Sequence, residues 1–188
     1  MALDNVAVQW PRTGRFYEPV PADEFADFAH VAAGAPAHAG PAAALAAHIA
    51  KTSTVRAGAY TDLVDLLLGL DGVLFATDAA AEDEDPVIDP DGCAWIAGGL
   101  ERFVAGHEAL GQAGDEITFD SVAVVLGAAL NQGRLAEQQL RWLDQRLDSL
   151  RDDEGNPPQW NFTLLELRVL TVFYRRCADR GFAVYADF

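Results

Sequence analysis

The sequence predicts a mainly α-helical single domain, residues 1–188, in which about six helices surround a buried C-terminal helix. Apolar residues recur at helical spacing through most of the chain, and several segments begin or end with helix-capping residues. The hydrophobic share of 51% in 188 residues is enough to form one core without a disulfide or a metal. No motif in the chain identifies a known family.

Three helices are predicted in the N-terminal part of the chain. The first begins at Pro21, which suits a first-turn position, and places Phe25 and Phe28 on one face. An alanine-rich helix is expected over 41–50 and another over 61–70. The inward side chains of the helix over 61–70 are expected to be Leu63, Leu66, Leu67 and Leu70.

An acidic segment, residues 77–92, precedes a fourth helix expected over 94–110. The segment contains two prolines and no basic residue, so we expect a mobile loop. Its spacing does not fit a calcium-binding EF-hand, because Gly92 at the invariant glycine position would put Val87 and Gly98 at ligand positions. The segment's carboxylates are candidate contacts for a basic partner: Asp78, Glu82, Asp83, Glu84, Asp85, Asp89 and Asp91.

Two further helices follow. Asp120 is the expected N-cap of a helix that runs through Leu130 and whose apolar run indicates burial on nearly all sides. A narrow apolar stripe then predicts a helix over 134–151, with Glu137 and Arg141 as an exposed ion pair.

The last helix, residues 163–180, is predicted to be the central core helix. Thr163 and Glu166 form a capping box, apolar residues cover most of its circumference, and Gly181 ends it. The segments at the two termini, 5–10 and 182–188, have strand-like composition and could pair in a small sheet.

The strongest compositional signal is the negative charge. The chain has 29 acidic and 13 basic residues, a formal net charge of −16, and most of the excess lies in residues 1–133. Such a field disfavours direct binding to nucleic acid and favours a basic protein partner. The alternative is that the acidity reflects genome composition or adaptation to salt. In that case the charge has no role in partner binding.

Catalytic and cofactor motifs are absent from the sequence. It contains no dinucleotide fingerprint, no P-loop and no G-x-S-x-G elbow, so we predict no cofactor and favour a binding protein over an enzyme. For a metal, Asp27 and His30 share a helix face, but no second carboxylate-x-x-His copy accompanies them. The further ligands considered are His48, His107, Glu101 and Glu108, and no metal site is predicted from them.

Arg168 and Arg175 form the core of an alternative hypothesis. Together with Asp179 they make a polar stripe on the otherwise apolar last helix, where an arginine can hold a carboxylate or phosphate. Under this hypothesis the protein is an enzyme or small-molecule binder, with His30, His48 or His107 transferring protons. The competing structural explanation is that these arginines pair with the protein's own acids, Asp179 among them.

Aromatic residues gather toward the two ends of the chain: Trp10, Phe16, Tyr17, Trp160 and Phe162. Packing in the core is one explanation, and a binding surface is the other, since Trp, Tyr and Arg dominate interface hot spots. Cys93 and Cys177 have no redox or metal spacing, and we expect free buried thiols in a reducing compartment. Without a signal peptide or a membrane-length apolar run, we expect a cytoplasmic protein that does not bind membranes.

The function that these features favour is an acidic protein-binding module that docks on a basic partner. An immunity protein or inhibitor that neutralises a cationic, nuclease-type toxin or enzyme has these properties, because complementary charge accelerates association.

Overall fold

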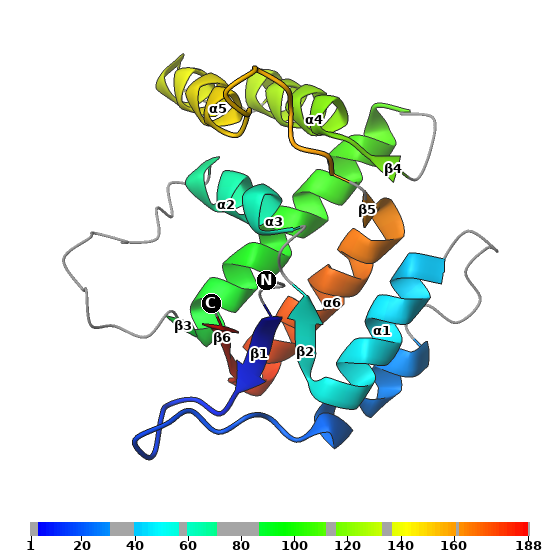
Figure 1. The fold of residues 1–188 in the computed structure, drawn as a ribbon, viewed down its shortest axis with the longest axis vertical. Coiled ribbons are helices and arrows are strands. Elements are labelled where there is room, and N and C mark those ends of the chain that lie inside the picture. The colour runs from blue at the N-terminus through cyan, green and yellow to red at the C-terminus, as the bar shows by residue number, and fades with distance from the viewer. Residues whose placement is uncertain are drawn as a thin grey trace.

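The computed structural model describes residues 4–30, 40–56, 60–70, 87–111, 116–132, 137–160 and 162–187 (Figure 1). The helices in these ranges are η1 (Ala22–His30), α1 (Gly40–Thr52), α2 (Thr61–Leu70), α3 (Pro90–Ala109), α4 (Phe119–Gln132), α5 (Glu137–Ser149) and α6 (Leu164–Arg180). The strands are β1 (Asp4–Val8), β2 (Thr54–Arg56), β3 (Val87–Ile88), β4 (Glu116–Ile117), β5 (Phe162–Thr163) and β6 (Ala183–Asp187). The mainly helical class is confirmed. A helical bundle is not, because a four-stranded antiparallel sheet is part of the architecture.

The sheet joins the two ends of the chain. Its strand order is β2-β1-β6-β3, and β1 pairs with β6 from Asp4↔Asp187 to Val8↔Ala183, which confirms the predicted pairing of the termini. Ala7 and Val184 face each other across this pair and are fully buried. Figure 1 shows the sheet at one end of the molecule, with α4 and α5 at the other.

Helix α6 lies at the centre of the described structure, as predicted, and packs against α3 along its length (Figure 1). The capping box is present: the Glu166 amide donates to the Thr163 hydroxyl, and the Thr163 amide donates to the Glu166 carboxylate. The helix ends at Gly181, whose φ of 70° is a left-handed conformation that glycine adopts without strain.

The first predicted helix differs in type from the expectation. Residues Ala22–His30 form a 3₁₀ helix, and residues 31–39 lie outside the described part of the chain. A 3₁₀ helix has three residues per turn, so Phe25 and Phe28 lie on the same side, and both are fully buried. The ring of Phe25 lies 5.4 Å from that of Phe173 of α6.

The acidic loop predicted over 77–92 is too long at its C-terminal end. Residues 87–88 form β3, and α3 begins at Pro90, before the predicted start at Ala94. Asp89 is the N-cap, because its side chain accepts a hydrogen bond of 2.7 Å from the amide of Gly92. Pro90 fits the first turn, where its missing N–H has no helical partner. Residues 77–86 lie outside the described residues.

Helix α4 also begins differently from the prediction. Thr118 makes the capping contacts, since its hydroxyl accepts from the amide of Ser121 (3.2 Å) while its own amide donates to the Ser121 hydroxyl (3.0 Å). Asp120 lies in the first turn and is not the cap. Burial on nearly all sides is also wrong, because the side chain of Val124 is 50% exposed.

The remaining helices lie within two residues of their predicted bounds where the structure describes them. Helix α2 has the predicted bounds, and its side chains Leu63, Leu66 and Leu67 are buried. The apolar stripe predicted for helix α5 consists of Ala136, Leu140, Leu143, Leu147 and Leu150. Of these, Leu143 and Leu147 are buried. The side chains of Leu70 and Glu137 are outside the described part, so the orientation of Leu70 and the ion pair with Arg141 stay predictions.

Candidate functional site

The predicted partner-binding acids divide into two groups. Asp78, Glu82, Asp83, Glu84 and Asp85 lie outside the described residues. Asp89 and Asp91 stand at the N-terminus of α3, Asp89 as its cap and Asp91 exposed in its first turn. Carboxylates at this end interact favourably with the helix dipole, so these two acids stabilise α3 whether or not a partner binds.

Arg168 and Arg175 both pair with acids of α3. Arg168 forms an exposed ion pair with Glu108, and Arg175 donates to Glu101 at 2.8 Å. Both arginines thus pair with the protein's own acids, as the competing structural explanation expected, and Arg175 pairs with Glu101 of α3. An anion at this stripe would have to share each guanidinium group with a carboxylate or displace that carboxylate.

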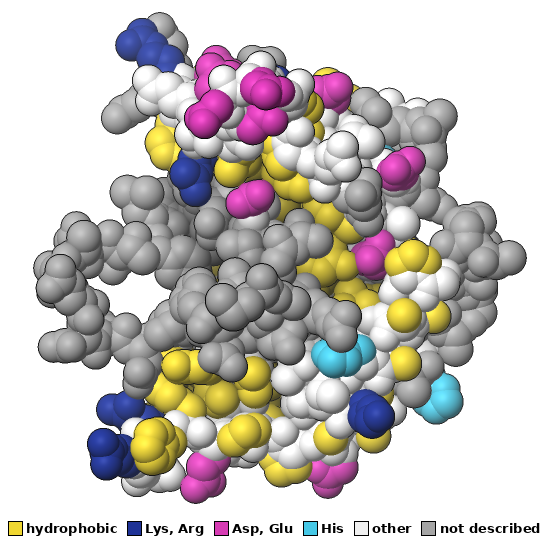
Figure 2. All heavy atoms as spheres, in the orientation of Figure 1, with side chains coloured by type: hydrophobic (Ala, Val, Ile, Leu, Met, Phe, Trp, Pro, Cys, Tyr) yellow, Lys and Arg dark blue, Asp and Glu magenta, His cyan; other side chains and the backbone are white. Residues whose placement is uncertain are grey.

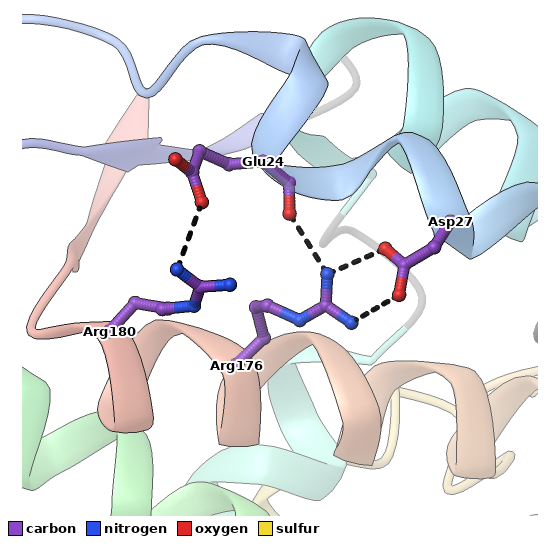
Figure 3. A network of polar contacts seen from close by, with 4 residues as sticks. All are labelled: Glu24, Asp27, Arg176 and Arg180. Atoms are coloured by element: carbon purple, nitrogen blue, oxygen red, sulfur yellow. Dashed lines mark hydrogen bonds and ion pairs between the residues drawn. The ribbon is translucent and has the colours of Figure 1, made fainter.

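A second arginine network fixes the C-terminal end of α6 to η1 (Figure 3). Arg176 donates to both carboxylate oxygens of Asp27, at 2.6 and 2.7 Å, and to the backbone carbonyl of Glu24 at 2.9 Å. Arg180 lies 3.6 Å from the Glu24 carboxylate. These hydrogen bonds lower the pKa of Asp27 and raise that of Arg176.

We did not predict this network from the sequence, although we considered Asp27 as a metal ligand. Its partner lies 149 positions away in the chain, so local spacing contains no signal for the pair. The described residues contain no group of three His, Cys, Asp or Glu side chains that could hold a metal ion.

The three histidines considered for proton transfer occupy different environments. His30 is exposed at the end of η1, and His48 shares a hydrogen bond of 2.9 Å with Thr54. His107 is 2% exposed, and its Nε2 atom has no hydrogen-bond partner in the described structure. The two carboxylates that were considered with the histidines as metal ligands, Glu101 and Glu108, form ion pairs with Arg175 and Arg168 of α6.

A buried polar cluster lies at the N-terminal end of α6. The hydroxyl of Tyr60 donates to Glu166 at 2.8 Å, and the same carboxylate accepts from the Thr163 amide. Burial, followed by the hydrogen bond to Glu166, raises the pKa of Tyr60 well above its usual range. Glu166 is buried, so the cluster satisfies a carboxylate inside the core rather than presenting it to a ligand.

The aromatic residues near the chain ends also divide into two groups. Trp160 and Phe162 are core residues. Residues 9–18, which we call the aromatic arm, expose Trp10 (40%) and Phe16 (75%). The arm is held at its base by the Gln9 amide, which donates to the Glu18 carbonyl at 2.8 Å, and by the stacking of Trp10 on Tyr17.

The arm also carries cations beside its rings. Arg12 lies 5.2 Å from the ring centre of Tyr17, and Arg15 lies 5.5 Å from that of Phe16. Figure 2 shows basic and hydrophobic side chains side by side at the end of the molecule where the arm lies in Figure 1. Ordered, exposed Trp, Tyr, Phe and Arg side chains are typical of protein-binding surfaces.

Exposed carboxylates gather on and after α5. Figure 2 shows a cluster of acidic side chains at the end of the molecule formed by this helix. We define the α5 acidic face as the exposed residues Asp144, Asp148, Asp153 and Glu154. Asp148 lies 3.8 Å from Arg151, a distance at which an exposed ion pair contributes little.

None of the helices in the described residues is long and apolar enough to cross a membrane. No protein-family model, no curated protein and no solved structure matches this chain. Function has therefore to be inferred from the residues themselves.

Proposed function

We propose that this protein is an acidic protein-binding module that docks on a basic partner, as an immunity protein or inhibitor of a cationic, nuclease-type toxin or enzyme does. The observation that supports it is the imbalance of 29 acidic against 13 basic residues. Even if every basic side chain paired with one acid, a net charge of −16 would remain for water, salt or a partner to neutralise.

The positions of the described ion pairs strengthen this argument. Arg168, Arg175, Arg176 and Arg180 of α6 are all engaged by acids of α3 and η1. These cations act within the molecule, and the carboxylates of the α5 acidic face are exposed, with Asp148 near Arg151. A cationic surface would be attracted to such a face, with an association rate that falls as salt increases.

The aromatic arm supports a binding role by a different route. Charge alone provides steering and specificity, whereas affinity usually depends on a few exposed aromatic and arginine side chains. Trp10 and Phe16 are exposed on an arm that is already ordered, which reduces the entropy lost on binding.

The test is affinity capture of the tagged protein from its own cell lysate at low salt, followed by a high-salt wash and mass spectrometry. We expect one basic protein, in near-stoichiometric amount, that salt releases. Recovery of no basic protein, or of one that salt does not release, contradicts the proposal.

Two charge variants sharpen the experiment. One neutralises the α5 acidic face (Asp144→Asn, Asp148→Asn, Asp153→Asn, Glu154→Gln), and the other neutralises part of the acidic segment (Asp83→Asn, Glu84→Gln, Asp85→Asn). We expect at least one of them to recover less partner, because each removes charge from an acidic surface or segment. Arg168→Ala is a control of opposite sign, since it removes a basic charge and leaves Glu108 unpaired on the surface, so it should not reduce recovery.

A further inference from the structure

The only cysteines of the chain, 84 positions apart, occupy neighbouring ends of two packed helices. Cys93 lies in the first turn of α3 and Cys177 in the last turn of α6. The ion pairs Arg168–Glu108 and Arg175–Glu101 show that the two helices run antiparallel, because the later α6 residue pairs with the earlier α3 residue. The start of α3 therefore lies at the same end of the helix pair as the end of α6.

The sheet brings these two helix ends together. Strand β3 leads directly into α3, strand β6 follows α6, and the two strands pair at Ile88↔Val184. The Cys93 thiol donates to the carbonyl of Ile88 at 3.8 Å, which places its sulfur against this strand pair. Cys177 is fixed to the start of β6 through its carbonyl, which accepts from the amide of Phe182 at 2.8 Å.

The two thiols share one buried junction of the core. Both side chains are fully buried and both thiols are free, and the helix and strand pairing places them at the same end of the α3–α6 pair. The neighbouring Cys93 side chain, followed by burial, raises the pKa of Cys177 above its usual range. The pair is therefore held as thiols, and an oxidant can react only when the helix ends open enough to form a thiolate.

We propose that Cys93 and Cys177 are a redox-sensitive pair that closes to an intramolecular disulfide and joins the start of α3 to the end of α6. The oxidant is an external disulfide or an azo compound such as diamide. The two thiols lose two protons and two electrons, one S–S bond forms, and the azo nitrogen–nitrogen double bond takes up both electrons and both protons to become a hydrazine.

The disulfide would act as a lock on the fold. It closes a long loop, so it lowers the entropy of the unfolded chain, and its native-state effect is confined to the junction where β3 pairs with β6. The inference is independent of the proposed partner, because it concerns two buried side chains and no surface residue.

The experiment treats the folded wild-type protein with diamide, then unfolds it in guanidinium chloride with N-ethylmaleimide and measures the intact mass. We expect a monomer that has lost two hydrogens and carries no maleimide, and that regains both thiols with dithiothreitol. The oxidised protein should melt roughly 5–10 °C higher than the reduced one. Two maleimide adducts, a disulfide-linked dimer, or a disulfide that forms only after unfolding in urea would overturn the proposal.

Single variants supply the control. Cys93→Ala and Cys177→Ala should each take up one maleimide after the same treatment, and diamide should leave their melting temperatures unchanged. A thermal gain from diamide that persists in either variant would also overturn the proposal, since the gain could not then come from this bond. The wild-type mass measurement decides the question even if a variant folds poorly.

Discussion

The two ends of α6 are attached to the rest of the molecule by different chemistry. At its N-terminal end, Glu166 is buried and satisfied by Tyr60 and the Thr163 amide. At its C-terminal end, Arg176 reaches Asp27 on a partly exposed surface, where the Asp27 side chain is 62% exposed. The difference indicates that a hydrogen bond contributes more to the stability of the fold when it is buried, because a buried group that loses its partner cannot form a hydrogen bond with water instead.

The first prediction concerns the buried end and has the largest expected effect. Glu166→Ala removes the capping carboxylate and leaves the hydroxyl of Tyr60 buried without an acceptor. We expect the free energy of unfolding, measured by urea denaturation, to fall by about 3 kcal/mol. Glu166→Gln is the control, since its amide oxygen can still accept one of the two hydrogen bonds.

A double-mutant cycle with Tyr60→Phe tests whether the two residues act as one unit. We expect the combined loss to be smaller than the sum of the single losses by about 1 kcal/mol or more. Additive losses would show that the hydrogen bond between them contributes little, and the contrast between the two ends of α6 would not depend on burial.

The second prediction concerns the C-terminal end. Arg176→Ala removes the bidentate pair with Asp27, the hydrogen bond to the Glu24 carbonyl and the cation–π contact with the Phe28 ring. We expect a loss of about 1–2 kcal/mol in the free energy of unfolding, because the network is partly screened by water. Arg176→Lys should recover only part of the loss, since lysine cannot make the two parallel hydrogen bonds.

The third prediction follows from the lowered pKa of Asp27. A carboxyl with a folded-state pKa below 3.8 stabilises the fold above pH 3.8, and that contribution is lost as the pH falls further. The stability difference between wild type and Asp27→Asn should therefore be constant between neutral pH and pH ~5 and should shrink toward pH ~3. A difference that grows on acidification would contradict the assignment of the ionised form to the native state.

The same two ends show what the sequence could predict. The capping box at Thr163 and Glu166 is local, so three-residue spacing was enough to predict it, as it was enough to predict the glycine that ends α6. Pairing of the terminal strands was also predicted, from strand-like composition at both ends. Tyr60 lies 106 positions from Glu166, and no pattern in the sequence connects them.

The candidate site was less predictable than the fold. Asp27 and His30 were considered as metal ligands because they share a helix face, although no metal site was predicted, and in the structure Asp27 accepts hydrogen bonds from Arg176. The arginine stripe at Arg168 and Arg175 was correctly recognised as a polar line on α6, but its partners, Glu108 and Glu101, follow from the packing of α3. Tertiary structure decides which acids pair with the arginines. The composition gives only the excess of acidic over basic residues.

The final prediction has the smallest expected effect and extends the comparison to an ion pair on the surface. Arg168→Ala breaks the pair with Glu108, in which both side chains are about half exposed. We expect the free energy of unfolding to fall by less than about 0.5 kcal/mol, since exposed pairs are screened by water and ions. The small loss should disappear in high salt, whereas the loss from Glu166→Ala should persist, because salt does not reach a buried hydrogen bond. A loss at Arg168 as large as that at Glu166 would show that α6 depends on its surface charges rather than on its buried end.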